Sequence, residues 1–484
     1  MHSSPSTKPK LTAAGLILLI TGQLMPQMDF SIVNVALDAI SHSLNANELT
    51  LGLVVSLYGL AFSVFLAMSG RLGDRYGRKK LFLSGVCLFA LASLLCGMAQ
   101  SIEVLIGARV LQGIAAAMLM PQILATIHVS LSGERHSKAI GLYGSVGGLS
   151  FVIGQIIGGW LVSADLFGLG WRSVFYLNLP FCLAILYFGQ KHIPETKEQQ
   201  ALSLDGVGTI LFAIMVILIL TSISLGSADN WSWHIWSLLA CTLPVGVILS
   251  RVEHQREAKQ KTPLLPPSLV KERQFHSGVL SLMIQAGTYG GFMFVVALTL
   301  QSGFHWPAYA SGNGFLGLGV FYFIGSLMVA RLAAKLGKAG YRGMIIIGAL
   351  INLVGYAALY WVMTTHTQHL SAWLLFVPMS VIGLGNAFAV NSSIRVGLAG
   401  VQAKFAGVGS ALMTTLQQAA IALGTALCGA FYTQNLSDSD PYQLQALKAG
   451  LYTLTAWIVV LLVYNTYLII QQQAQKPQHA SQTK

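Results

Sequence analysis

Long hydrophobic runs recur from near the N-terminus almost to the C-terminus, and short segments that carry most of the charge separate them. Each run is apolar over roughly 18 to 25 residues, the length of helix that crosses about 30 Å of hydrocarbon. Strands are excluded as the spanning element, because a membrane barrel would show alternation over about ten residues. The pattern predicts fourteen membrane helices, centred near residues 24, 60, 90, 114, 150, 181, 215, 242, 287, 320, 351, 380, 418 and 460.

The amino-acid composition is that of a membrane protein. Of its 484 residues, 54% are hydrophobic and 9% are charged, whereas a soluble protein has about 25% charged residues. The class is therefore a polytopic all-α membrane protein. The cysteines lie inside the hydrophobic runs without ligand-type spacing, so we interpret them as packing residues and expect no metal. They are Cys87, Cys96, Cys182, Cys241 and Cys428.

The distribution of positive charge predicts the orientation. If the N-terminus is cytoplasmic, 25 of the 28 Lys and Arg residues lie on the inner side. The three others are Arg109, Arg172 and Lys448. This asymmetry follows the positive-inside rule and predicts both termini in the cytoplasm. The net charge of +12 thus reflects topology, and we expect no nucleic-acid partner.

The largest inner loop, residues 251–273, carries charges and three prolines and is the natural linker between two halves. The expected units are an N-terminal six-helix bundle over residues 1–195, two extra helices with the linker over residues 196–274, and a C-terminal six-helix bundle over residues 275–484.

The two halves share a trace of duplication. GRLGDRYGRKK begins at Gly70 after the second run, and ARLAAKLGKAG begins at Ala330 after the second run beyond the linker. Without gaps, Arg71 aligns with Arg331 and Gly77 aligns with Gly337. Equivalent loops predict two pseudo-symmetric bundles, an architecture that places a transport site between the repeats.

Several motifs resemble those of the major facilitator superfamily. GRLGDRYGRKK resembles its loop signature between spans 2 and 3, and LIGARVLQGIAAA, residues 105–117, is similar to its span-4 motif. Three further segments are similar to its fourteen-span drug:proton antiporter branch: MDFSIVNVAL at 28–37, WRSVFYLNLP at 171–180 and GVGSALMTTLQQAAIALGTAL at 407–427. The resemblance implies a major facilitator fold in the cell membrane, acting as a monomer without a cofactor on a small molecule and protons.

Two positions depart from the branch. Gln155 follows Gly154 where the span-5 signature of the exporters usually has proline. Asp38 ends the first-span motif, where proline is usual. The first departure leaves the direction of transport open.

Asp29 is the only acidic residue well inside a predicted span. An unpaired carboxylate there costs roughly 2.5 to 3.5 kcal/mol, so it must be paired, hydrated or protonated. Arg109 in span 4 shares its depth, because both residues lie about 12 to 13 Å below the outer surface at the helical rise. The resemblance implies that both line the central cavity.

Two interpretations of this pair stay open. Asp29 binds a proton and a cationic substrate in turn, so that competition for one carboxyl couples the two fluxes, or it forms a static ion pair that fixes the bundle. Arg109 either tunes the proton site or serves packing and snorkelling.

Asp74 lies among basic residues in the loop after span 2. The resemblance implies a latch that engages the helix end near Phe405 to Gly407 in the other half and holds the outward-open state, where a carboxylate at a helix N-terminus is favoured. The latch residues would be Asp74, Arg71, Arg75, Arg78, Gly70 and Gly77. The alternative is a topogenic charge cluster with a tight turn. The second copy has Ala334 at this position, which would make the latch single-sided.

Candidates for the substrate pocket are the carboxyl of Asp29 and side chains with aromatic, thioether or amide groups, which suit lipophilic cations. They are Asp29, Gln27, Tyr58, Met118, Gln155, Gln285, Tyr289, Phe292 and Gln417. Each could instead face lipid or the core. The glycines of span 5, which include Gly154, Gly158 and Gly159, serve close packing or a flexing gate.

The function expected from these features is proton-coupled export of lipophilic, cationic compounds by alternating access. A transporter of one small metabolite is the nearest alternative, and a sensor that kept the fold is a second. An enzyme is not expected, because no intramembrane cluster of His, Cys or carboxylates is present in the sequence. The absence of a P-loop excludes ATP as the direct energy source.

Overall fold

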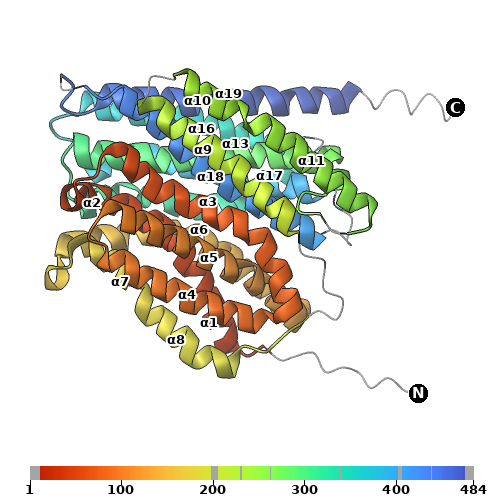
Figure 1. The fold of residues 1–484 in the computed structure, drawn as a ribbon. Coiled ribbons are helices and arrows are strands. Elements are labelled where there is room, and N and C mark those ends of the chain that lie inside the picture. Colours follow the sequence, from red (N-terminus) through yellow and green to blue (C-terminus); the bar gives the residue numbers. More distant parts are fainter. Residues whose placement is uncertain are drawn as a thin grey trace, which may run out of the picture.

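The computed structural model describes residues 11–197, 205–228, 232–261, 263–337, 339–399, 401, 406–437 and 439–474. The regular structure in these ranges is helical throughout (Figure 1). The N-terminal helices are α1 (Ala13–Ile32), α2 (Leu37–Leu44), α3 (Glu48–Tyr76), α4 (Arg78–Met98), α5 (Ile102–Ser130), α6 (Gly133–Ala164), α7 (Ser173–Tyr176) and α8 (Asn178–His192). The middle helices are α9 (Gly206–Ala228), α10 (Trp233–Ala240), α11 (Thr242–Ala258) and α12 (Pro267–Lys271). The C-terminal helices are α13 (Arg273–Leu298), α14 (Ala308–Gly314), α15 (Leu316–Lys335), α16 (Gly340–Thr365), α17 (Ala372–Ala399), α18 (Ala406–Gln434) and α19 (Leu444–Ala474).

Most of these helices have the length and composition of membrane spans. Among the described residues, 11 helices qualify, and the bent pair within α3, Thr50–Leu66 and Met68–Tyr76, makes 12. Outside this count, α6 and α18 are also long, with 32 and 29 residues. The all-helical membrane architecture is thus confirmed, whereas the number of fourteen spans stays a prediction.

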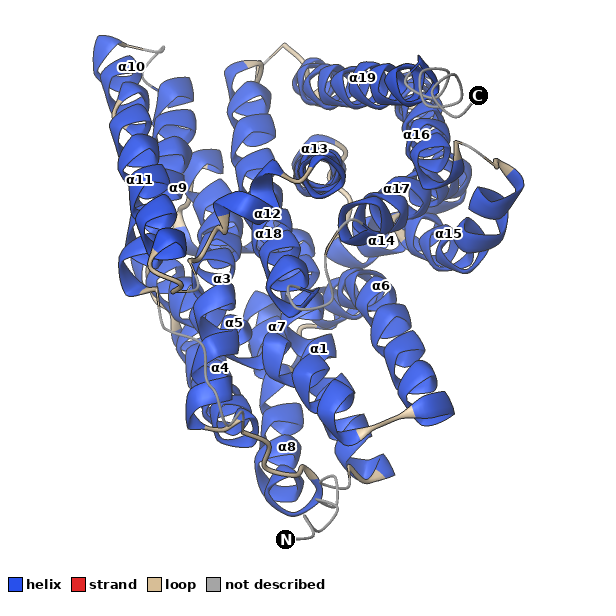
Figure 2. Cartoon of the chain, turned by 90° about the vertical axis from the view of Figure 1, so that its right-hand side faces the viewer, coloured by secondary structure: helices blue, strands red, loops and turns tan. Residues whose placement is uncertain are grey.

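Two bundles lie side by side, one built from α1 to α8 and the other from α13 to α19 (Figures 1 and 2). Three pairs of helices make the main contacts between them: α3 with α18, α6 with α14, and α6 with α15. We call the first the α3/α18 seam and the other two together the α6/α14 seam. The start of α1 and the end of α19 lie at the same end of the molecule (Figure 1). The domain boundaries near residues 195 and 275 stay predictions.

The middle helices flank the α3/α18 seam. Helix α9 packs against α3 from one bundle and α18 from the other, while α11 packs on α9. The cluster that joins them is apolar, which explains why α9 needs no polar face. Its buried residues include Leu60, Val64, Phe212, Val216, Leu220, Leu249, Ala419 and Ala426.

Polar contacts join the linker, residues 251–273, to the end of α3 and to the residue that precedes α9. Arg71, near the end of α3, donates to the carbonyl oxygen of Pro263 at 2.7 Å. Asp205 pairs with Arg256 at 3.2 Å and accepts from the backbone N–H of Leu264 at 2.9 Å. Because Asp205 and Arg71 are buried, these contacts hold the middle of the linker against the end of α3 and the start of α9.

Candidate functional site

Asp29 is completely buried in the N-terminal bundle. One carboxylate oxygen accepts a hydrogen bond and ion pair from Nη1 of Arg109 on α5. The other oxygen accepts from Nε2 of Gln112 on α5 and from Nδ2 of Asn178 on α8, both at 2.8 Å. The hydroxyl of Ser93 on α4 accepts from the same two amides, at 2.9 and 3.3 Å. Four helices therefore meet at one carboxylate.

Arg109 is equally enclosed, with no exposed surface. Its guanidinium carbon lies 4.1 Å from the centre of the Tyr58 ring, and its Nε donates to the carbonyl oxygen of Val54 at 3.2 Å. The Tyr58 hydroxyl donates to the carbonyl oxygen of Pro26 at 2.8 Å. Contact with an aromatic face stabilises a desolvated cation. The two charged groups thus have each other, amides and an aromatic ring as partners, and neither has surface exposed to solvent in this conformation.

The equal depth of Asp29 and Arg109 left open whether their helices are neighbours, and the structure makes the two side chains direct partners. Sequence reasoning did not identify Gln112 and Asn178 as ligands of the carboxylate, although both lie in quoted motifs. The available signal was a neutral amide in an otherwise apolar run, since a buried amide needs a partner. The predicted role of the pair in proton coupling stays a prediction.

A small cavity of about 60 Å³ lies between the two bundles. Its walls come from α6, α13, α15, α17 and α18, and the residues are Gly147, Val152, Ala286, Tyr289, Leu318, Gly319, Tyr322, Asn386, Val390, Gln417 and Ile421. Ligand sites measure roughly 300 to 1,000 Å³, so this conformation is too closed to hold a drug-sized molecule. The bundles must separate for one to enter.

Only some of the predicted pocket residues lie at this cavity. Tyr289 and Gln417 line it. Gln285 lies beside it and donates through Nε2 to Oδ1 of the lining residue Asn386. Gln27 lies next to Gly147 of the wall.

The remaining candidates lie elsewhere in this conformation. Phe292 is buried against Tyr356, with ring centres 5.6 Å apart, and Met118 packs beside Gly85. Tyr58 contacts Arg109. Gln155 is buried, and its amide has no hydrogen-bond partner among the described residues.

The segment expected to form a loop after span 2 is mostly helical, because α3 continues to Tyr76 and α4 begins at Arg78. Its charged side chains make separate contacts. Asp74 forms an ion pair with Arg78 at 2.6 Å, whereas Arg71 reaches the linker. The guanidinium of Arg75 lies 5.5 Å from the ring of its neighbour Tyr76. Phe405, part of the predicted docking point of Asp74, lies outside the described residues. The latch role of this segment stays a prediction.

Gly77 explains the sharp turn between α3 and α4. Its φ of 112° is a conformation that glycine adopts without strain. Gly70 shows no comparable need for glycine: its φ is not positive, and the nearest atom to an added Cβ is 3.6 Å away.

The carboxylate of Glu195 caps the start of α4, a contact that sequence reasoning missed. Its two oxygens accept from the backbone N–H groups of Lys79 and Lys80 at 3.1 and 3.3 Å. Such groups in the first turn of a helix have no partner inside the helix, and a negative charge there is favoured. Glu195 thereby ties the end of the N-terminal bundle back to the junction between α3 and α4.

Glu195→Ala is expected to loosen the first turn of α4. Without the acceptor, the amide hydrogens of Lys79 and Lys80 should exchange with solvent about tenfold faster, as expected for loss of a helix cap. Hydrogen exchange followed by mass spectrometry on peptides from this turn measures the effect. Glu134→Ala removes an exposed glutamate that pairs with Lys138 on α6 and should leave this turn unchanged. Equal protection in both variants would contradict the capping role.

The bundles touch at the end that the predicted orientation assigns to the outside. Nε2 of Gln301 donates to the carbonyl oxygen of Asn34 at 3.2 Å, and the N–H of Tyr309 donates to the Ser163 hydroxyl at 3.1 Å. Two glycines bring the backbones of α6 and α14 together. A Cβ on Gly159 would lie 2.4 Å from the carbonyl oxygen of Ala308, and one on Gly312 would lie 2.3 Å from that of Gln155. We call these contacts the outer closure.

Comparison with known proteins agrees with this architecture. Residues 19–425 match the family model described as the Major Facilitator Superfamily. The chain is 31% identical to the puromycin resistance protein of Streptomyces alboniger, over 85% of this chain and 80% of that protein. It is 27% identical to the tetracenomycin C resistance and export protein of Streptomyces glaucescens, over 91% of this chain and 81% of that protein.

Two further likenesses extend this picture. The chain is 28% identical to a multidrug resistance protein of Mycobacterium tuberculosis, over 88% of this chain and 76% of that protein. Among solved structures, a POT family transporter in complex with 5-aminolevulinic acid superposes with a TM-score of 0.68 at 13% identity, over 95% of this chain and 98% of that chain. At this identity, the likeness to the solved structure supports the fold alone.

Proposed function

Because this chain belongs to the major facilitator superfamily, we propose that it exports lipophilic compounds in exchange for protons by alternating access between its two bundles. Membership of this family makes it a multi-pass membrane transporter rather than an enzyme. Resistance and export proteins among its relatives support outward transport of drugs or antibiotics. The proposal includes cytoplasmic termini and a monomer in the cell membrane.

One observation carries the proton coupling in this proposal: a carboxylate without any exposed surface that contacts a single buried arginine. A buried charge pair is weak support for stability, because a hydrophobic pair of similar volume is often no worse. A buried charge pair has a use, however, if its carboxyl gains and loses a proton during the transport cycle. On this proposal, protonation of Asp29 releases Arg109 and lets the four helices around the carboxylate shift.

Asp29→Asn is expected to abolish compound-driven proton release. The amide keeps the shape of the side chain and, like a protonated carboxyl, has one accepting and one donating group, but it takes up no proton. Inverted membrane vesicles that are acidified inside would receive puromycin, ethidium or a neutral hydroxyanthraquinone, and the proton efflux would be recorded. We expect proton efflux with the wild type for at least one compound. With Asp29→Asn, the efflux should be no greater than from vesicles that lack the protein.

Asp38→Asn is the matched control, because Asp38 belongs to the same span and is partly exposed at its outer end. It should retain the wild-type flux. Equal flux in wild type and Asp29→Asn would remove Asp29 from the coupling mechanism. Absence of flux with every compound would instead argue against antiport of lipophilic compounds.

A further inference from the structure

The wall of the cavity between the bundles carries no full charge. Its described residues are aliphatic, glycine, tyrosine and amide side chains, without Asp, Glu, Lys, Arg or His. A cation that enters such a space loses its hydration without gaining a counter-charge, which is costly. The chemistry of this cavity therefore disfavours cations. The sequence had suggested cationic substrates, on the expectation that Asp29 lines the cavity.

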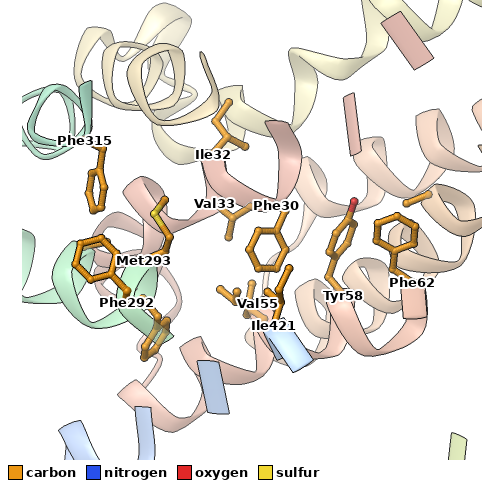
Figure 3. Close-up of a cluster of buried hydrophobic side chains, with 14 of the residues drawn as sticks. Phe30, Ile32, Val33, Val55, Tyr58, Phe62, Phe292, Met293, Phe315 and Ile421 are labelled. Atoms are coloured by element: carbon orange, nitrogen blue, oxygen red, sulfur yellow. The ribbon is translucent and has the colours of Figure 1, made fainter. Parts of the chain in front are cut away.

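Asp29 does not line this cavity, and apolar and aromatic side chains pack beside the Asp29–Arg109 pair. The Tyr58 ring covers Arg109, and the ring of Phe30 lies 6.2 Å from that of Tyr58. Figure 3 shows Phe30 and Val55 beside Ile421, which is itself a wall residue of the cavity. All four of these apolar and aromatic neighbours are buried. In this conformation the carboxylate is therefore not placed to act as the counter-charge of a molecule in the cavity.

The wall residue Asn386 and its neighbour Gln285, which lies beside the cavity, offer hydrogen bonds suited to an uncharged molecule. Asn386 and Gln285 bond to each other through Oδ1 and Nε2. Nδ2 of Asn386 and Oε1 of Gln285 have no partner among the described residues, although both atoms are buried. Buried amide groups without partners are costly, so a ligand that satisfies them gains in affinity. The pair supplies one donor and one acceptor, which complement a carbonyl next to a hydroxyl or N–H.

Two tyrosines complete this chemistry. Tyr289 on α13 and Tyr322 on α15 line the cavity together with Asn386. Aromatic rings pack favourably against other flat rings. Resting on the export function proposed above, we infer that this cavity takes uncharged, flat aromatic compounds with a carbonyl beside a hydroxyl or N–H, and that Asn386, positioned by Gln285, selects them.

A pair of probes that differ mainly in charge tests the inference. The first is a neutral hydroxyanthraquinone, and the second is the same ring system with a trimethylammonium group. Proton release and disappearance of the compound from the medium are measured in inverted vesicles. We expect transport of the neutral probe and at least about tenfold less transport of the cation. Asn386→Leu should raise the half-saturating concentration of the neutral probe about tenfold, since one buried hydrogen bond is lost.

Asn386→Asp provides the sharper test, because it puts a carboxylate on the wall with almost no change in shape. We expect this variant to gain transport of the cationic probe. Asn391→Asp is the control on the same helix, since Asn391 bonds to Ser326 and does not line the cavity. It should keep the wild-type preference for the neutral probe.

The outcomes separate this inference from the proposed function. Asp29-dependent transport of the cation at the same level as the neutral probe, or above it, would overturn the inference and leave proton-coupled export intact. Transport of neither probe by the wild type would overturn both. Because the wild-type comparison decides alone, a variant that fails to fold does not prevent a result.

Discussion

Arg109→Met is expected to leave little folded protein and no transport. The substitution removes the ion-pair partner of Asp29 but keeps a long side chain in the space between Tyr58 and Phe175, whose rings lie 4.1 and 5.9 Å from the guanidinium carbon. A carboxylate without exposed surface then has only two amides to compensate its charge. Breaking a buried pair on one side costs about 3 to 5 kcal/mol, a large share of the stability of a typical domain. Thermal unfolding of the purified protein in detergent measures the loss.

The double variant Asp29→Asn with Arg109→Met separates stability from function. It removes both charges, so the melting temperature should recover towards that of the wild type while proton release stays absent. Arg395→Met is the control, because Arg395 is exposed at the end of α17 and contacts Tyr341. An unchanged melting temperature for Arg109→Met would show that the pair contributes nothing to the bundle.

Gly159→Ala is expected to open the outer closure. The added Cβ would lie 2.4 Å from the carbonyl oxygen of Ala308 and 2.8 Å from Cα of Tyr309. Both are backbone atoms, so rotation of a side chain cannot relieve the contact. Overpacking costs about 1 to 3 kcal/mol. If the bundles separate to avoid it, the ratio of outward-open to closed molecules rises about 5- to 150-fold.

A cysteine at Ser302 in a background without the native cysteines reports the opening. Ser302 lies at the closure and donates to Asp38 at 3.4 Å, so a membrane-impermeant maleimide should label it faster in Gly159→Ala than in wild type. Gly107→Ala is the control, since no atom lies within 4 Å of a Cβ at that position. Equal labelling rates in the three proteins would mean that α6 and α14 adjust locally and that the closure is unaffected.

The fold could be predicted from the sequence to a large extent, because its determinants are local. Each run of apolar residues must satisfy its backbone hydrogen bonds as a helix in lipid. The depth of Asp29 and Arg109 followed from helical rise alone. The neighbours of a residue, however, depend on which helices touch, and that is decided by packing along whole helix faces.

Three contacts illustrate what sequence alone could not supply. Asn178 reaches Asp29 across 149 positions of the chain, and Glu195 caps a helix that begins more than a hundred residues earlier. Gly159 and Ala308 meet only because the two bundles close at one end. Asp29, the expected cation site, does not line the cavity in this conformation, and the reason is the same. Residue depth is readable in the sequence, but the rotation of α1 within its bundle is not.

The two seams between the bundles meet different surroundings. Helix α9 covers the α3/α18 seam along the apolar cluster described above. At the α6/α14 seam, Trp160 and Tyr309 remain 57% and 49% exposed. When the bundles rock, lipid chains are displaced directly at the second seam, whereas at the first the motion is taken up by protein sliding on protein. The energetic cost of each transport cycle should therefore depend on bilayer thickness and stiffness mainly through one side of the molecule.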